Sequence, residues 1–168
     1  MTRASTDKEI RRQDIVQAVA QHLVQNGIHN SALRALAKSV GMSDRMLMYY
    51  FETKEELIAQ ALLLIASGLI GSLENALPRG HVSGQQILDA LRLMGEDPAA
   101  HPGQKLWFEI IGLAMRDDGP YKTTATQILD GWEEWIKDRL GSKRAHMAPA
   151  ILAQAEGEMM INLLRRPD

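Results

Sequence analysis

Residues 33–57 read LRALAKSVGMSDRMLMYYFETKEEL, and this stretch decides the fold of the chain. Its first apolar residues recur at the three- and four-residue intervals of one helix face, at Leu33, Leu36, Ala37 and Val40. Gly41 follows directly and can adopt the positive φ that a tight corner needs. The pattern predicts a helix of about two turns that ends at this glycine, with Ser31, or Asn30 before it, as its cap.

A second short helix is predicted to begin after Ser43, which is placed to cap it. Its inner face comprises Met46, Leu47, Tyr50 and Phe51, and the residues on or beside its outer face are Asp44, Arg45, Met48 and Tyr49. A small residue at Ala37, the glycine four residues later and Leu47 beyond it allow the two short helices to cross closely. This order is that of a helix-turn-helix, whose second helix is free to enter a DNA major groove.

The flanking residues complete the pattern. An amphipathic helix that ends at Asn26-Gly27 precedes the two short helices. Thr53, with Glu56 three residues later, forms a capping box that opens a helix running to about Leu77, before Pro78.

These residues resemble the TetR-type bacterial transcriptional regulators. The matching stretches, in chain order, are residues 15–19, Leu23, Gly27, residues 33–37, residues 40–43, Leu47, residues 49–51 and residues 53–57. The chain departs from the usual pattern at His22, Arg45, Met48 and Tyr50, which bears on the DNA sequence that is read more than on the fold. The resemblance implies an all-α fold: a three-helix DNA-binding head over residues 1–53, followed by a helical ligand-binding and dimerisation domain over residues 54–168.

Charge is divided unevenly along the chain. Residues 1–50 carry seven Lys and Arg against four acidic residues, a balance of +3, and the remainder carries 12 against 17, a balance of −5. The amino-terminal part is therefore the one suited to a polyanion, although +3 over 50 residues is also ordinary for a soluble domain.

Composition excludes several classes of protein. The chain has 168 residues and no cysteine, so no disulfide framework or cysteine-ligated metal is expected, and a reducing, cytoplasmic location fits. The apolar run Ala61–Ile70 is interrupted by Ser67-Gly68, so neither a membrane span nor a signal peptide is predicted. The hydrolase elbow, the zinc-protease motif and the glycine-rich phosphate loops are absent, and the five histidines lack metal-ligand spacing. We therefore expect no enzyme activity, no metal and no cofactor.

The rest of the chain predicts further helices, near residues 83–95, 103–116, 121–140 and 145–164. The helix at 103–116 is apolar over most of its surface, which predicts burial on several sides, and Asp117-Asp118-Gly119-Pro120 is expected to end it. The last two helices carry more apolar surface than one neighbouring layer needs. They are expected to form a homodimer interface that includes Trp132, Trp135, Ile151, Leu152, Ala155 and Met159. The alternative is that these faces belong to the core of the single chain.

The resemblance also implies an effector site between the central helices. Residues that could line it are Met94, Trp107, Ile111, Met115 and Trp132, and they suit a small apolar or amphipathic molecule. Met and Trp at helical spacing are nevertheless core residues more often than they are pocket walls.

Double-stranded DNA with a near-palindromic operator is the expected partner of the head. Arg45 is placed to read a base edge, most plausibly guanine, and Ser31, Ser43, Tyr49, Tyr50 and Lys54 to contact the backbone. Asp44, Met46 and Met48 complete the expected contact surface. The function that follows is a DNA-binding transcriptional regulator, a repressor released by its effector. A constitutive DNA binder without an effector and an all-helical interaction protein that has lost DNA binding remain as alternatives.

Overall fold

A computed structural model describes residues 3–116 and 119–166 of the chain, so the predicted terminator Asp117-Asp118 lies outside the described residues. Every regular element in this part of the chain is helical, as predicted for an all-α fold. The α-helices are α1 (Arg3–Asn26), α2 (Leu33–Ser39), α3 (Asp44–Tyr50), α4 (Lys54–Ala76), α5 (Gly84–Glu96), α6 (His101–Ala114), α7 (Pro120–Leu140) and α8 (Ala148–Arg165). Short 3-10 turns precede α2, α6 and α8, at Ile28–Asn30, Pro98–Ala100 and Ala145–Met147.

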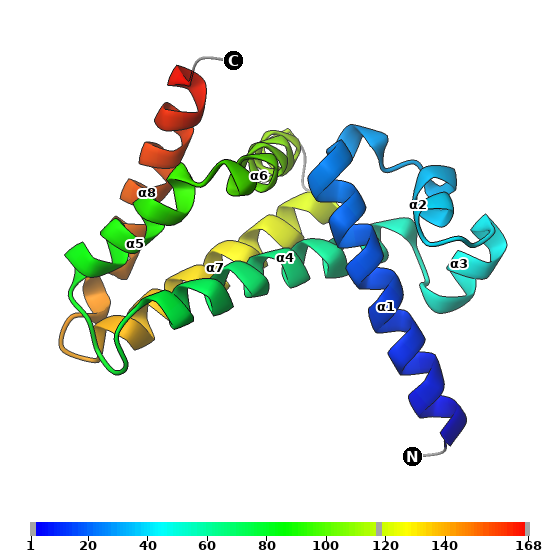
Figure 1. The fold of residues 1–168 in the computed structure, drawn as a ribbon, viewed down its shortest axis with the longest axis horizontal. Coiled ribbons are helices and arrows are strands. Elements are labelled where there is room, and N and C mark those ends of the chain that lie inside the picture. Colours follow the sequence, from blue (N-terminus) through cyan, green and yellow to red (C-terminus); the bar gives the residue numbers. More distant parts are fainter. Residues whose placement is uncertain (1–2, 117–118, 167–168) are drawn as a thin grey trace.

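The two long helices α4 and α7 lie side by side and connect the two ends of the molecule (Figure 1). Helices α1, α2 and α3 pack at one end, and α5 and α8 lie at the other. Helix α6 packs on α7 between these ends and also contacts α1 and α8.

A continuous apolar core fills the end that contains α1, α2 and α3, and we call it the head-side core. Leu23, Leu36 and Leu47 contribute one fully buried side chain from each of these helices. The same cluster continues through the first half of α4 to Leu106 and Ile110 of α6 and to part of α7. The helix-turn-helix therefore shares its core with the helices that follow it, across the predicted boundary after residue 53.

The predicted turn and cap residues agree with the backbone at three positions. Gly41 has a φ of +66°, and the Ser43 hydroxyl caps α3 by accepting the N–H of Met46 at 3.2 Å. The Thr53 hydroxyl accepts the N–H of Glu56 at 3.0 Å at the start of α4, but the Glu56 carboxylate accepts the N–H of Glu52 and not that of Thr53, so the predicted capping box is only half formed.

The predicted cap of α2 is wrong. Ala32 holds the cap position, and neither Ser31 nor Asn30 supplies a side-chain bond there. Ser31 instead ends the preceding 3-10 turn with its side chain buried, where it hydrogen-bonds to Tyr121 of α7. The short turn at residues 28–30, which the apolar spacing did not reveal, directs Ser31 inward.

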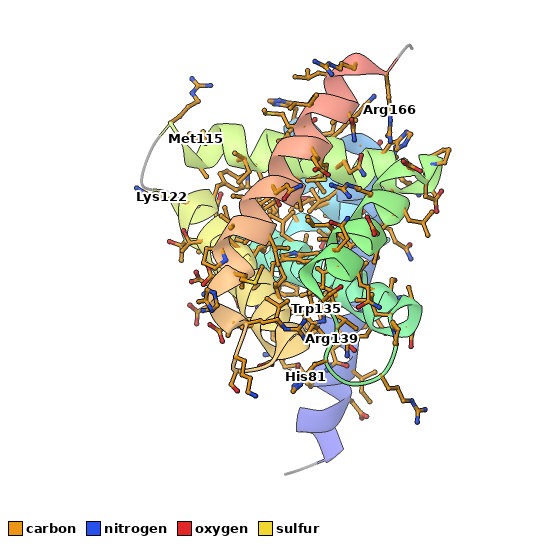
Figure 2. The ribbon with its side chains drawn as sticks, turned by 90° about the vertical axis from the view of Figure 1, so that its left-hand side faces the viewer. His81, Met115, Lys122, Trp135, Arg139 and Arg166 are labelled. Atoms are coloured by element: carbon orange, nitrogen blue, oxygen red, sulfur yellow. The ribbon has the colours of Figure 1, made fainter. Side chains whose placement is uncertain are left out.

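A second, smaller cluster, the distal core, joins α5, α7 and α8 with the end of α4. Ile151 is 5% exposed and Trp135 is 8% exposed within this single chain, so the prediction that these two residues form a dimer interface is wrong. The indole N–H of Trp135 donates to Glu74, and the guanidinium of Arg139 donates to the carbonyl of Pro78. Figure 2 shows Trp135, Arg139 and His81 together at one end of the molecule.

Helix α6 is less enclosed than its apolar composition predicts. Gln104, Leu106 and Ile110 are its buried residues. Met115, just after the helix, is 83% exposed, and Figure 2 shows it at the end of α6. The prediction of burial on several sides is confirmed in part, because α7, α1 and α8 all contact this helix while Pro102, Lys105 and Gly112 are exposed.

Helix α4 is long and apolar enough to cross a membrane, judged by length and composition, which the interrupted run at residues 61–70 did not predict. Its packing accounts for part of that composition, since 28% of the apolar window is buried and Leu63 and Leu64 are exposed. Leu57, Ile58 and Ala61 are buried in the head-side core, and Ile65 and Leu69 line the cavity described below. A core helix of this kind passes the same test as a membrane span.

Candidate functional site

The exposed face of α3 is the first candidate surface. Leu47 is fully buried and Phe51 is 2% exposed, whereas Met46 is 50% and Tyr49 64% exposed. Met46 therefore does not belong to the inner face on which its apolar character placed it. At 100° per residue, Leu47 shares its face with residues three and four positions later, and Met46 is rotated away from them. Met46 and Tyr49 therefore point into solvent from a helix whose opposite face is buried in the core.

Basic side chains surround this face. Arg45 of α3 lines a shallow hollow together with Arg34 and Lys38 of α2, and all three are exposed. Arg34 and Lys38 contribute to the positive charge of residues 1–50, but the apolar pattern of α2 did not predict them in the site. Their position beside Arg45 depends on how the two helices cross.

Helix α1 fixes the orientation of α3 through Arg12. Its Nη1 donates to the carbonyl of Tyr50 at 2.9 Å, its Nη2 pairs with the carboxylate of Glu56, and its guanidinium lies 4.7 Å from the centre of the Phe51 ring. Lys8, also on α1, lies 4.6 Å from the centre of the Tyr49 ring and adds positive charge beside the exposed tyrosine.

The other residues expected at the DNA surface differ in exposure. Ser43 and Asp44 are exposed. Met48, Tyr50 and Lys54 are half-buried. Ser31 is buried and turned away from this face, as described above.

A cavity of about 250 Å³ lies between the head-side core and the distal core. Three of the residues expected in an effector site line it: Met94, Trp107 and Trp132. Ile111 and Met115 do not, because they follow Trp107 on α6 by four and eight residues and lie beyond the cavity. Leu152, Ala155 and Met159, expected at a dimer interface together with Trp132, belong to the cavity wall instead.

The wall of the cavity includes polar groups that the apolar patterns did not reveal. The carboxylate of Glu156 accepts the indole N–H of Trp107 at 2.8 Å, and burial raises the pKa of this carboxyl. Arg92 donates to both oxygens of Glu158 at 2.7 Å, and this contact, with a further one from Gln154, lowers the pKa of Glu158 to about 2. No local pattern in the sequence assigned either Glu156 or Glu158 to the site.

Helix α6 connects the cavity to the head. Trp107 lies in the cavity wall, and two residues later the carboxylate of Glu109 accepts the backbone N–H of Ile28 at 2.8 Å. Ile28 follows Gly27 at the turn that leaves α1, where Gly27 has a φ of +73°. Helix α6 thus contacts both the cavity and the turn that precedes α2.

The sequence of this helix-turn-helix has known relatives. Residues 15–61 match the family model described as bacterial regulatory proteins, tetR family. This match assigns the helix-turn-helix segment of the chain to the TetR family. The HTH-type transcriptional regulator PksA of Bacillus subtilis is 23% identical over 131 residues, which cover 77% of this chain and 64% of that regulator. The chain thus aligns with less than two thirds of the length of this curated relative.

Solved structures confirm the fold beyond the head. A transcriptional regulator from Rhodococcus sp. Rha1 aligns with a TM-score of 0.70 over 92% of this chain and 84% of its own, at 19% identity. The multidrug binding protein EbrR, solved in complex with proflavin, aligns with a TM-score of 0.67 over 92% of this chain and 89% of its own, at 24% identity. These two structures share with this chain the arrangement of a head followed by a helical domain.

Proposed function

We propose that this chain is a sequence-specific DNA-binding transcriptional regulator that acts as a homodimer and is released from DNA by a small molecule. The observation that carries the proposal is the exposed face of α3. Arg45 lies there between the basic residues of α2 and the exposed Tyr49, on a helix that Arg12 holds in place. Arginine in the first turn of a recognition helix is well placed to contact guanine, and flanking basic residues favour phosphate.

A homodimer is part of the proposal because α3 is short. Its seven residues span about 10 Å, which is enough for only a few base pairs. Specific recognition in a genome then requires a second head on the other half of a near-palindrome, one helical turn or more away.

The surface proposed for dimerisation is a stripe on α8 that faces away from the cavity. It repeats every three or four residues, at Ala150, Ala153, Gly157, Met160 and Leu164. Met160 is 45% and Leu164 79% exposed in the single chain. The small residues at the start of the stripe permit close approach of a second helix, and the larger ones provide apolar area to bury.

Release by a small molecule is supported by α6. A ligand that fills the cavity pushes on Trp107 and, through the same helix, on the contact between Glu109 and Ile28. To release DNA, the ligand must bind more tightly to the arrangement in which the two recognition helices no longer match successive grooves.

A gel shift with the DNA upstream of its own gene tests the proposal. We expect the chain to retard this DNA specifically, even in the presence of excess shuffled DNA. Adding a ligand that fills the cavity should abolish the retardation. Binding without any response to a ligand that occupies the cavity would identify a constitutive DNA binder. If a selection from genomic DNA at low salt enriches no sequence, the result would support the alternative of an all-helical interaction protein that has lost DNA binding.

A further inference from the structure

Glu156 is the acidic group of the cavity wall that has no ion pair among the described residues. It projects from α8, and Trp107 is its hydrogen-bond partner among the described residues. That bond uses one carboxylate oxygen, Oε2, so the other oxygen remains available to a ligand. Arg92 and Glu158, also in the wall, neutralise each other through a two-point contact.

Aromatic rings lie beside this carboxylate. Trp107 and Trp132 both line the cavity, with Met94 and Met159 among the apolar residues around them. Trp132 is held edge to face against Trp135, with 5.8 Å between the ring centres and 85° between the planes. The faces of indole rings attract cations, and methionine adapts its shape to planar ligands.

The remaining positive group of the wall is Arg166, at the far end of α8. Its Nη2 donates to the carbonyl of Gly95 at 2.6 Å, and its buried Nη1 has no partner among the described residues. Arg166 directly follows the end of α8 at Arg165, and a helical rise of about 13 Å separates the backbone of Glu156 from that end. Figure 2 shows Arg166 at the end of α8 opposite to Trp135. The guanidinium of Arg166 is bound to Gly95, and it forms no ion pair with Glu156.

We propose that the cavity binds a planar, monovalent organic cation, with its charge on the free oxygen of Glu156 and its ring against Trp107 and Trp132. This inference rests on the proposed function, because it names the class of molecule for the same effector site. A carboxylate in apolar surroundings loses hydration, and a bound cation replaces that hydration with a direct ion pair. The volume of about 250 Å³ favours a compact ring system over a long chain.

Binding of N-methylacridinium, a permanent cation, tests the proposal against acridine, which is neutral in mildly alkaline buffer. Both are titrated into the full chain without DNA and followed by fluorescence. The wild-type chain is expected to bind the cation on the order of tenfold more tightly than the neutral ring. Glu156→Gln keeps the shape of the side chain and is expected to bind both rings with similar affinity.

Two further variants control this result. Glu134→Gln makes the same change of net charge at an exposed position of α7 and is expected to keep the preference for the cation. Trp107→Phe removes the indole donor and reduces the aromatic surface, so it is expected to weaken cation binding while the helical circular dichroism stays unchanged. If Glu156→Gln does not fold, Trp107→Phe still decides whether this corner of the cavity holds the ring.

Three outcomes would overturn the assignment. The first is equal affinity of the wild-type chain for the two rings. The second is a preference for the cation that persists in Glu156→Gln. The third is tight binding of octanoate in place of the cation, abolished by Arg166→Gln, which would identify an anionic ligand at the other end of the cavity.

The DNA assay is read separately from this titration. A cation that binds through Glu156 without changing the gel shift would confirm the site and overturn its role as an effector site. Specific DNA binding by a chain that binds neither acridine nor N-methylacridinium would support the proposed DNA-binding regulator. It would overturn the proposal that the cavity binds a cation.

Discussion

The two cores of the molecule differ in how completely they are filled. The part of the head-side core beneath the helix-turn-helix is closed: Leu23, Leu36 and Leu47 are fully buried, and Arg12 ties α1 to the end of α3. The distal core borders a cavity, which Leu62, Leu106 and Ile128 of the head-side core close from the other side, and the cavity wall includes carboxylates and guanidinium groups. Close packing holds the recognition helix in one orientation. The helices around the cavity are packed less completely, so they can shift when a ligand binds there. This difference gives the two regions separate roles in the proposed function: the head-side core positions the recognition helix, and the helices around the cavity respond to a bound ligand.

The largest expected effect tests whether the distal region is a true core despite its cavity. Ile151→Glu places a carboxylate in the buried cluster and should destabilise the chain by at least about 4 kcal/mol, measured by urea denaturation. Met160→Glu makes the same change on the exposed stripe of α8 and should leave the single chain folded.

The same pair of variants tests the dimer. Sedimentation should show Met160→Glu as a folded monomer with weakened operator binding. Folded monomers from Ile151→Glu would return that residue to the interface and contradict its place in the core.

A truncation in each region should sharpen the contrast. Leu47→Ala removes buried methyl groups from the closed core and should lower the free energy of unfolding by about 2–5 kcal/mol. Met159→Ala enlarges the existing cavity and should lower the free energy of unfolding by about 1 kcal/mol. Equal losses in urea denaturation would mean that the cavity is as tightly packed as the head and would remove the basis of the comparison.

Arg45→Ala should affect DNA binding and leave stability unchanged, because the side chain is exposed. The expected loss is about 1–3 kcal/mol on the specific site, with relaxed preference at one position in each half-site. Competition gel shifts with single-base variants of the operator provide the measurement. The same loss on random DNA would make Arg45 a phosphate contact.

A smaller effect is expected from Lys54→Ala, at the start of α4. Lys54 lies 3.7 Å from the carboxylate of Glu55, so part of its charge is already offset. The variant should lower affinity for all DNA sequences alike and reduce the slope of log affinity against log salt by about one unit. A slope equal to that of the wild-type chain would place Lys54 outside the interface.

The smallest effect separates two carboxylates by pH. Burial alone would raise the pKa of Glu56, but the N–H of Glu52 and the guanidinium of Arg12 together hold it below its ordinary value of 4.5. Burial raises the pKa of Glu156, and the N–H of Trp107 offsets only part of this rise. The contribution of Glu56 to stability is therefore present above about pH 4.5 and is lost as the pH falls through its lowered pKa. The contribution of Glu156 is present below that pH and is lost as the pH rises through its raised pKa.

Urea denaturation of both Gln variants across this range measures the difference. Glu56→Gln should weaken the dependence on pH on the acidic side, and Glu156→Gln should relieve the loss that occurs on moving toward neutral pH. Identical pH profiles for the two variants and the wild-type chain would contradict both assignments.

Local patterns in the sequence predicted the head well. Gly41, Ser43 and Thr53 act within a few residues of themselves, so the conformations and bonds they adopt can be inferred from spacing. Ser31 and Met46 were misplaced because a short 3-10 turn and the exact rotation of a seven-residue helix decide where they point.

The second half was predicted as helices but not as a site. Ile151, Trp135, Leu152 and Met159 all have apolar side chains, and periodicity cannot tell a core from a cavity wall or from an interface with another copy. Glu156 became informative only when α8 packed it against Trp107, which lies 49 residues away in the chain. Contacts at that separation depend on how whole helices approach one another.

The bond between Glu109 and Ile28 limits how freely the parts of this protein could be exchanged. A Cβ built on Gly27 would stand 2.9 Å from Oε2 of Glu109, so the turn after α1 is shaped around a side chain 82 residues further along the chain. A chimera that joined this head to a foreign helical domain would lose the acceptor for the N–H of Ile28 and leave a gap beside Gly27. Successful exchange would therefore require the graft to include α6 together with the head, although the two are separate in sequence.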